Sequence, residues 1–166
     1  MTAFCLDTSA YSNFRRGNEE VAALLDRAEL VGVPTVALGE LRTGFLLGGR
    51  RQRNETELTA FLDSSVVEVL PVDAETSRHY AEIVAELRKA GTPVPTNDIW
   101  IAATAARNGT TVLTCDDHFE RLGRVAEHEA ALAGARVQDG PAGDRPGGAE
   151  RDEQQGPELD HLHSPE

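Results

Sequence analysis

The segment from residue 94 to 119 constrains the fold of this chain more than any other; it reads VPTNDIWIAATAARNGTTVLTCDDHF. Its first half repeats apolar residues at helical spacing, with Thr96 as the expected N-terminal cap. Trp100, Thr104 and Arg107 lie on the opposite side of this helix and are expected to face solvent or a partner. Gly109 ends that pattern, because glycine adopts the left-handed backbone that closes helices. The run TVLT at residues 111–114 is short, β-branched and apolar, as in strands buried on both faces. The segment therefore predicts a helix, a tight turn and a buried strand.

Acidic residues stand at both ends of this predicted unit. Asp98 lies in the first helical turn and points into the middle of the apolar face. An ionised carboxylate on such a face is costly unless a cation meets it, so Asp98 either complements the helix dipole or belongs to a functional site. Asp116 and Asp117 follow the strand. Asp117 could bind a second ion or cap the next helix, and we favour the cap.

Short apolar runs alternate with helical patterns along the rest of the chain. Strands are predicted at residues 3–6, 31–33, 66–70, 111–114 and, as a weak edge strand, 135–137. Helices are predicted at residues 8–14, 19–30, 36–47, 54–64, 74–90, 98–108 and 120–133. Thr8 or Ser9 is the expected cap of the first helix. This alternation is typical of an α/β sandwich with a mostly parallel sheet. Ligands bind such sheets beyond the carboxyl ends of the strands, where Asp7 and Asp116 lie.

Length and composition point to one folded domain with a tail. The 166 residues allow a sizeable core, and Cys5 and Cys115 are too few for a disulfide scaffold; both are expected in buried strands. No secretory signal or apolar run of about 18 residues is present, so we expect a soluble, cytoplasmic protein with no membrane contact. Residues 138–166 are acidic and rich in Gly and Pro, which predicts a disordered tail after a domain at residues 1–137.

The net charge of −12 argues against a general basic coat for nucleic acids but permits a local basic rim. Fifteen of the sixteen basic residues are arginine, which suits planar contacts with phosphate. The run GGRRQR at residues 48–53 is expected to be a flexible basic connection. The arginines that could line a nucleic-acid path, or equally lie on a solvated surface, are Arg15, Arg16, Arg42, Arg50, Arg51 and Arg53.

Four acids follow a predicted strand or lie on a helix that packs beside one: Asp7, Glu40, Asp98 and Asp116. Brought together, they would require a countercharge, because like charges raise one another's pKa. Their oxygen ligands suit Mg²⁺ or Mn²⁺, and no His or Cys spacing suggests zinc; His118 is not expected to bind the ion. Such an acid cluster with a bound ion is suited to the hydrolysis of phosphodiesters.

Four segments together carry a resemblance to a known family. They are FCLDTSAYSNF at residues 4–14, TVALGELRTG at 35–44, TNDIWIAATAARNG at 96–109 and TVLTCDDHFERL at 111–122. In this order and spacing the sequence resembles the PIN-domain ribonucleases, and most of all the VapC toxins of bacterial toxin–antitoxin pairs. The resemblance covers residues 3 to about 137. It implies a three-layer α/β/α domain that acts as a toxin and hydrolyses RNA phosphodiester bonds with Mg²⁺ or Mn²⁺.

The resemblance also implies roles for individual residues and partners. The four acids, Asp7, Glu40, Asp98 and Asp116, match the family's catalytic metal-site positions, and Thr8, Asn97 and Thr114 match side chains that support them. A small cognate antitoxin and a homodimer are implied, with Leu46, Leu47 and Trp100 as exposed apolar candidates for the dimer surface. The sequence does not choose between tRNA, rRNA and mRNA as the substrate.

Three other interpretations have different residue requirements. A haloacid-dehalogenase-like phosphotransferase needs a second acid two residues after Asp7, where the chain has Ser9. A receiver domain needs a lysine after a late strand, but the one lysine, Lys89, lies on a predicted helix. A non-catalytic PIN-like module that binds RNA or protein remains the alternative. The presence of all four acids favours activity, because a binding module has no need of a repulsive cluster.

Overall fold

A parallel sheet forms the centre of the computed structural model, which describes residues 2–116 and 135–136 of the chain. Its strands are β1 (Ala3–Leu6), β2 (Leu30–Pro34), β3 (Val67–Leu70), β4 (Thr111–Thr114) and β5 (Ala135–Arg136). They lie in the order β3-β2-β1-β4-β5, and each neighbouring pair is parallel. The predicted parallel sheet is confirmed, and the carboxyl ends of all these strands meet at one edge.

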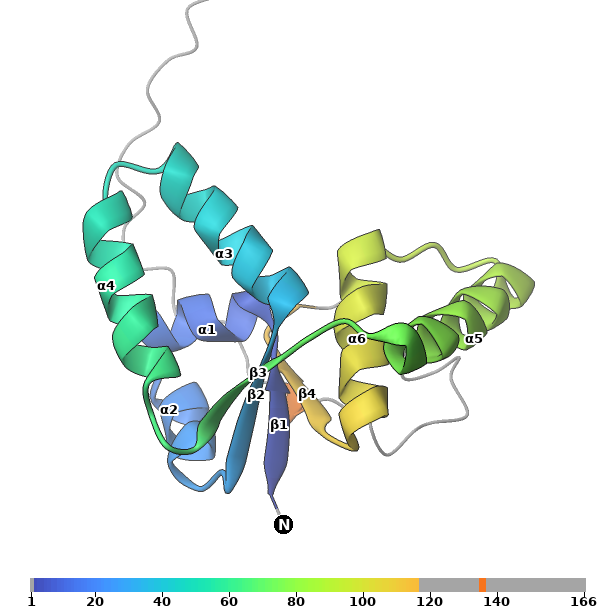
Figure 1. Cartoon of the computed structure of the whole chain (residues 1–166), viewed down its shortest axis with the longest axis horizontal. Helices are drawn as coiled ribbons and strands as arrows, with labels where there is room; N and C mark the ends of the chain where they lie inside the picture. Colours follow the sequence, from blue (N-terminus) through green and yellow to red (C-terminus); the bar gives the residue numbers. More distant parts are fainter. Residues whose placement is uncertain (1, 117–134, 137–166) are drawn as a thin grey trace, which may run out of the picture.

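Helices cover both faces of the sheet, as predicted for a three-layer α/β/α domain. Within the described residues they are α1 (Thr8–Arg15), α2 (Glu19–Asp26), α3 (Thr35–Leu47), α4 (Arg51–Leu62), α5 (Ala74–Ala90) and α6 (Thr96–Asn108). In Figure 1, α1 and α2 lie on one side of the sheet and α5 and α6 on the other. The helices α3 and α4 form a hairpin whose connecting loop lies far from the sheet.

The side chains of the central strands alternate between two apolar cores, because successive residues of a strand point to opposite faces. Phe4 and Leu6 of β1 belong to the core with α1 and α2, and Cys5 belongs to the core with α5 and α6. Burial raises the pKa of the Cys5 thiol, so this cysteine packs as an apolar residue, as predicted. Cys115 is only half-buried and follows β4, so its predicted position inside a buried strand was wrong.

Two predicted helix caps were also wrong. Asp7, rather than Thr8 or Ser9, is the cap of α1, because its carboxylate accepts the backbone N–H of Ser9. Pro95 occupies the cap position of α6, and no side chain caps that helix. Thr96 is instead its first residue. By contrast, Gly109 has the left-handed φ of 61° that the sequence predicts for the end of α6.

The predicted flexible connection at residues 48–53 is shorter than expected. Helix α4 begins at Arg51, so Arg51 and Arg53 lie on a helix rather than in a loop. An ion pair between Arg53 and Glu57, four residues apart, supports this first part of the helix. The two glycines, Gly48 and Gly49, mark the turn between α3 and α4, and the basic residues that follow from Arg51 belong to α4.

Helix α6 is covered on two sides rather than one. Thr104, predicted to face solvent or a partner, is fully buried at 0% exposure. Trp100 is half-buried and stacks on Tyr80 of α5, with ring centroids 3.9 Å apart and an interplanar angle of 18°. The expectation that Trp100 is exposed was therefore wrong, whereas its predicted place in a dimer contact stays a prediction. Leu46 and Leu47 are exposed, as predicted.

Several predictions fall on residues outside the described part of the chain. They concern the helix at residues 120–133, the tail at residues 138–166, Asp117 and His118. Among the helices that the structure does describe, none combines the length and apolar character needed to cross a bilayer.

Gly32 in β2 provides a test of the core packing. A Cβ at this position would lie 2.3 Å from Cδ1 and 2.9 Å from Cγ of Leu70, which is itself buried. Gly32→Ala must displace Leu70 from its packed position. We expect the free energy of unfolding to fall by about 1–3 kcal/mol, measured by urea denaturation.

Gly44→Ala is the matched control, because a Cβ on Gly44 in α3 meets nothing within 4 Å. Alanine also favours the helical backbone by up to about 1 kcal/mol relative to glycine. This variant should be as stable as the wild type or more stable. Equal losses in both variants would contradict the packing described for Gly32.

Candidate active site

Asp7 lies at the carboxyl end of β1, beside the end of β4. The strands pair Leu6 with Leu113, and the backbone N–H of Asp7 donates to the carbonyl oxygen of Leu113 at 3.0 Å. This register brings Asp7 next to Thr114, although the two residues are 107 positions apart in the chain. The Asp7 side chain is only 4% exposed, so its carboxylate is held inside the fold.

Three hydrogen bonds converge on one oxygen of this carboxylate. Oδ2 of Asp7 accepts from Oγ of Ser9 at 2.5 Å, from Oγ1 of Thr114 at 2.9 Å and from the backbone N–H of Ser9 at 3.2 Å. Burial raises the pKa of Asp7, and these hydrogen bonds oppose the rise because they favour the ionised form. The other oxygen, Oδ1, takes part in none of the three.

Glu40 on α3 connects two further helices through its carboxylate. Its Oε2 accepts from the hydroxyl of Thr8 in α1 at 2.6 Å, and its Oε1 accepts from the amide of Asn97 in α6 at 2.7 Å. Thr8 directly follows Asp7, and Asn97 directly precedes Asp98. Glu40 therefore fixes the distance between the two chain segments that carry these aspartates.

Asp98 and Asp116 are both half-buried. Asp98 lies in the first turn of α6, where a negative charge complements the helix dipole. The backbone N–H of Asp116 donates to Oγ1 of Thr114 at 2.9 Å, so the residue is tied to the hydroxyl that also bonds Asp7. Asp116 therefore lies beyond the carboxyl end of β4, as predicted, and the role of both acids in a metal site stays a prediction.

Five of the seven predicted site residues form two hydrogen-bonded clusters that meet at the consecutive residues Asp7 and Thr8. The first cluster holds Asp7 and Thr114, and the second holds Thr8, Glu40 and Asn97. Asp116 is connected to the first cluster by its backbone N–H, and Asp98 directly follows Asn97 of the second. Ser9 belongs to the first cluster, although the sequence suggested only a helix cap for it. The sequence feature that could have indicated this contact is a serine two residues after Asp7, the acid that directly follows β1.

The ligand chemistry of this edge suits a hard divalent ion, because carboxylate and hydroxyl oxygens are the groups that Mg²⁺ and Mn²⁺ prefer. Within residues 2–116, however, no three acidic, His or Cys side chains converge closely enough to hold an ion. The described residues supply the right ligand types on a scaffold that aligns their backbones. They do not form a closed cage.

Three of the six arginines predicted to contact RNA form ion pairs with acids of α4. Glu57 pairs with Arg15 at 2.5 Å and with Arg53 at 2.9 Å, and these bonds hold the pKa of Glu57 below its usual value. Arg42 lies 3.6 Å from Glu55. The remaining three, Arg16, Arg50 and Arg51, are exposed.

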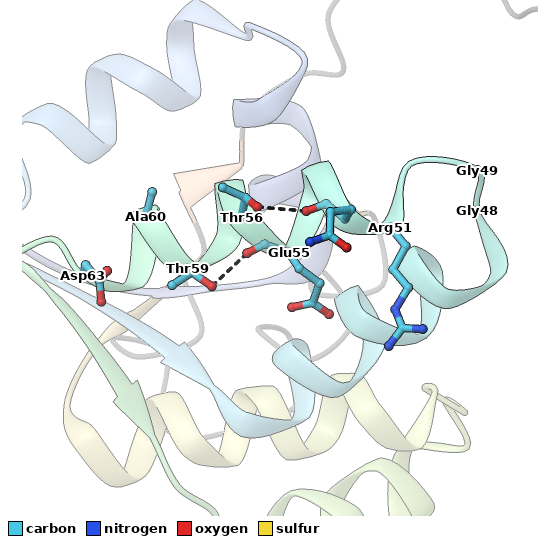
Figure 2. A pocket seen from close by; sticks show the side chains of 9 residues that line it. Gly48, Gly49, Arg51, Glu55, Thr56, Thr59, Ala60 and Asp63 are labelled. Atoms are coloured by element: carbon cyan, nitrogen blue, oxygen red, sulfur yellow. Dashed lines mark hydrogen bonds between the residues drawn. The ribbon is translucent and has the colours of Figure 1, made fainter.

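Two hollows on the described surface differ in their relation to the acids. A pocket of about 470 Å³ is lined by Glu40, Asn97 and four residues of α3, so it lies next to the second cluster. A larger pocket of about 960 Å³ follows the polar face of α4 from the Gly48-Gly49 turn to Asp63 (Figure 2). None of the four predicted catalytic acids lines the larger pocket, although Arg51 does.

The raised pKa of Asp7 predicts how the metal-free protein responds to pH. The folded state binds the Asp7 proton more tightly than the unfolded state, so stability falls as pH rises from about 3.8 through the raised pKa. Asp7→Asn removes this charge. We expect the variant to be more stable than the wild type at pH 7 in EDTA, with a difference that shrinks as pH falls toward 3.8.

Asp26→Asn makes the same change at an exposed position of α2 and is the control. Urea denaturation of the three proteins across pH measures the effect. An Asp7→Asn variant that is less stable than the wild type at pH 7 would contradict the cost assigned to this buried charge.

Comparisons with known proteins agree with this geometry. The PIN domain family matches residues 4–125. Ribonuclease VapC5 of Mycobacterium tuberculosis is 34% identical over 124 residues, which cover 75% of this chain and 90% of that protein. Ribonuclease VapC4 of the same organism is 39% identical over 91 residues, covering 55% of this chain and 70% of that one. The crystal structure of VapBC-5 from M. tuberculosis, a member of a family of toxin–antitoxin systems, matches with a TM-score of 0.64 and 31% identity, covering 82% of this chain and 100% of that chain.

The matched span contains the five acidic and hydroxyl side chains on which the site depends: Asp7, Glu40, Asp98, Thr114 and Asp116. It also contains strands β2 to β4, all of β1 except Ala3, and all six described helices. Fold, site and sequence similarity therefore coincide over the same residues. The chain belongs to the PIN-domain family and, within it, to the group of VapC ribonucleases.

Proposed function

We propose that this protein is a metal-dependent endoribonuclease that acts as the toxin of a toxin–antitoxin pair. The observation that carries the proposal is the buried carboxylate of Asp7 directly after β1, in a chain whose relatives are named ribonucleases. The clustered hydroxyl and amide groups around Asp7 and Glu40 support it, because they hold carboxylates where a fold without a site would place apolar side chains.

Asp7, Asp98 and Asp116 would hold the principal Mg²⁺ or Mn²⁺ ion. Such an ion supplies charge compensation for phosphate and Lewis-acid activation of water. The protein contributes the alignment. The hydroxyls of Ser9 and Thr114 direct Oδ2 of Asp7, and the β1–β4 pairing brings Asp7 next to Thr114, whose hydroxyl also accepts the backbone N–H of Asp116. Some adjustment of the side chains would accompany ion binding, because the described acids do not form a closed cage.

Glu40 would orient the attacking water or a second ion. Each of its carboxylate oxygens accepts one hydrogen bond, from Thr8 or from Asn97, and can accept a further one. These two bonds fix the direction of the carboxylate, so the position of the water that it orients would be fixed as well. The adjacent pocket of about 470 Å³ offers room for part of an RNA strand beside Glu40.

The basic residues suggest an RNA path that is partly neutralised in the free protein. Arg16, Arg50 and Arg51 are exposed and available to phosphate. Arg15 and Arg53 are paired with Glu57, so RNA phosphates would compete with that carboxylate for their guanidinium groups. The identity of the RNA, whether tRNA, rRNA or mRNA, stays open.

The partner proposed from the toxin–antitoxin relatives is a small antitoxin that covers the acids. An antitoxin arginine could pair with these carboxylates in place of the metal ion, since guanidinium binds carboxylates through two parallel hydrogen bonds. A homodimer also stays a prediction. Leu46 and Leu47, 58% and 86% exposed at the end of α3, are apolar residues that such an interface could cover.

Removal of the metal or of one of its proposed ligands should abolish cleavage. We expect wild-type protein to cut structured bacterial RNA with Mn²⁺ and to stop in EDTA. Asp98→Asn should slow cleavage by more than about a hundredfold, the upper range for changes to groups that only support a metal ligand.

Asp26→Asn, with the same loss of charge on the exposed face of α2, should cut RNA at the wild-type rate. Gel analysis of labelled RNA measures both variants. Binding of RNA without any metal-dependent cleavage would instead support the non-catalytic PIN-like module.

Expression in a bacterial host tests the proposed role as a toxin. Wild-type protein should arrest growth, because RNA cleavage stops protein synthesis, whereas Asp98→Asn at equal protein levels should not. If a neighbouring gene encodes a small antitoxin, its co-expression should restore growth, as colony counts would show. Normal growth with well-expressed wild-type protein would remove the toxin proposal and leave the ribonuclease proposal to the cleavage assay.

A further inference from the structure

Ser9 joins the two chain segments that carry Asp7 and Asp116. Its Oγ donates to Oδ2 of Asp7 at 2.5 Å and accepts from the backbone N–H of Cys115 at 2.9 Å. It also lies 3.1 Å from Oγ1 of Thr114. Ser9 lies on α1 and Cys115 directly precedes Asp116, so one hydroxyl bridges the start of α1 and the end of β4.

The protons of this cluster can be assigned by counting donors. Ser9 and Thr114 each have one hydroxyl proton, and each donates it to Oδ2 of an ionised Asp7. Neither proton then remains for the 3.1 Å contact between the two hydroxyl oxygens. Each hydroxyl uses a lone pair to accept one backbone N–H, from Cys115 at Ser9 and from Asp116 at Thr114. The consecutive backbone amides of Cys115 and Asp116 are therefore bound to the two hydroxyls that also bind Asp7.

Maintenance of the helix alone does not account for the Ser9 hydroxyl. Asp7 is the cap of α1, and it accepts the backbone N–H of residue 9, which any residue except proline supplies. Alanine has a higher helix propensity than serine. A serine that served only the helix could thus be replaced by alanine with little loss.

We propose that Ser9 is a positioning residue that sets Asp7 and Asp116 relative to each other for ion binding. This inference rests on the proposed metal-dependent function. Ser9 acts through its two partners: its donated proton orients the Asp7 carboxylate, and its lone pair holds the Cys115 amide and thereby the residue that follows. Neither contact requires Ser9 to touch the ion or the RNA.

The experiment compares Ser9→Ala, which removes the hydroxyl, with Ser9→Thr, which keeps it. Ser12→Ala, one turn later in α1 and outside the cluster, is the control. Mn²⁺ affinity is measured on the full chain by electron paramagnetic resonance of the free ion. Amide hydrogen exchange of Cys115 is measured in EDTA, and kcat and KM are measured on an RNA hairpin with saturating Mn²⁺.

We expect Ser9→Ala to weaken Mn²⁺ binding about ten- to a hundredfold, as for other groups that orient metal ligands. Its Cys115 amide should exchange faster, because the amide loses its acceptor. At saturating Mn²⁺, kcat should fall while KM for RNA stays within about twofold of the wild type, and Ser9→Thr should restore affinity to within about threefold. Ser12→Ala should match the wild type in every measurement.

Unchanged Mn²⁺ affinity in a folded Ser9→Ala variant would overturn the inference, and so would a Ser9→Thr variant as weak as Ser9→Ala. If Ser9→Ala does not fold, Ser9→Cys replaces it, because a thiol keeps the size of the side chain but is a weak donor. Failure of the proposed function is a separate result: the wild type itself would then bind no Mn²⁺ and cut no RNA.

Discussion

The structure depends on one buried negative charge, the carboxylate of Asp7. A carboxylate that is 4% exposed would be strongly unfavourable without donors, and the chain supplies two hydroxyls and a backbone N–H to a single oxygen. Those donors come from the start of α1 and the end of β4, so satisfying the charge also fixes how these elements meet. Helix α1 and strand β4 therefore cannot shift relative to each other without breaking a hydrogen bond to Asp7. The pairing of β1 with β4 is coupled to the position of Asp7 in the same way.

Glu40 has a complementary role on the other side of the same edge. Its two oxygens bind residues adjacent to Asp7 and Asp98, so helices α1, α3 and α6 are tied together by side chains rather than by apolar packing alone. Hydrogen bonds to a charged group are roughly twice as strong as neutral ones, which makes this a stiff connection for a half-buried location. The three helices are therefore connected at this edge by the Glu40 carboxylate before any ligand binds.

The sequence predicted most elements because apolar spacing reports burial directly; β1, β4 and the ends of α5 and α6 lie where spacing and glycines place them. It failed where tertiary contacts override local preference. Asp7 outcompetes two hydroxyl residues as the cap of α1, and Tyr80 covers a tryptophan that a single helix would leave exposed. The four acids were predicted from residue type and position, and their role as a metal site stays a prediction. The contacts of Ser9 with Thr114 and Cys115, by contrast, are encoded by no local pattern.

The central place of β1 in the sheet has a consequence for the synthesis of the chain. Asp7 is made first, but its donor Thr114 follows 107 residues later, and Asp116 later still. While the nascent chain is still on the ribosome, β4, which pairs with β1, is the last of strands β1 to β4 to emerge. A nuclease assembled in this way stays incomplete beside the mRNA that is being translated until nearly the whole domain has left the ribosome.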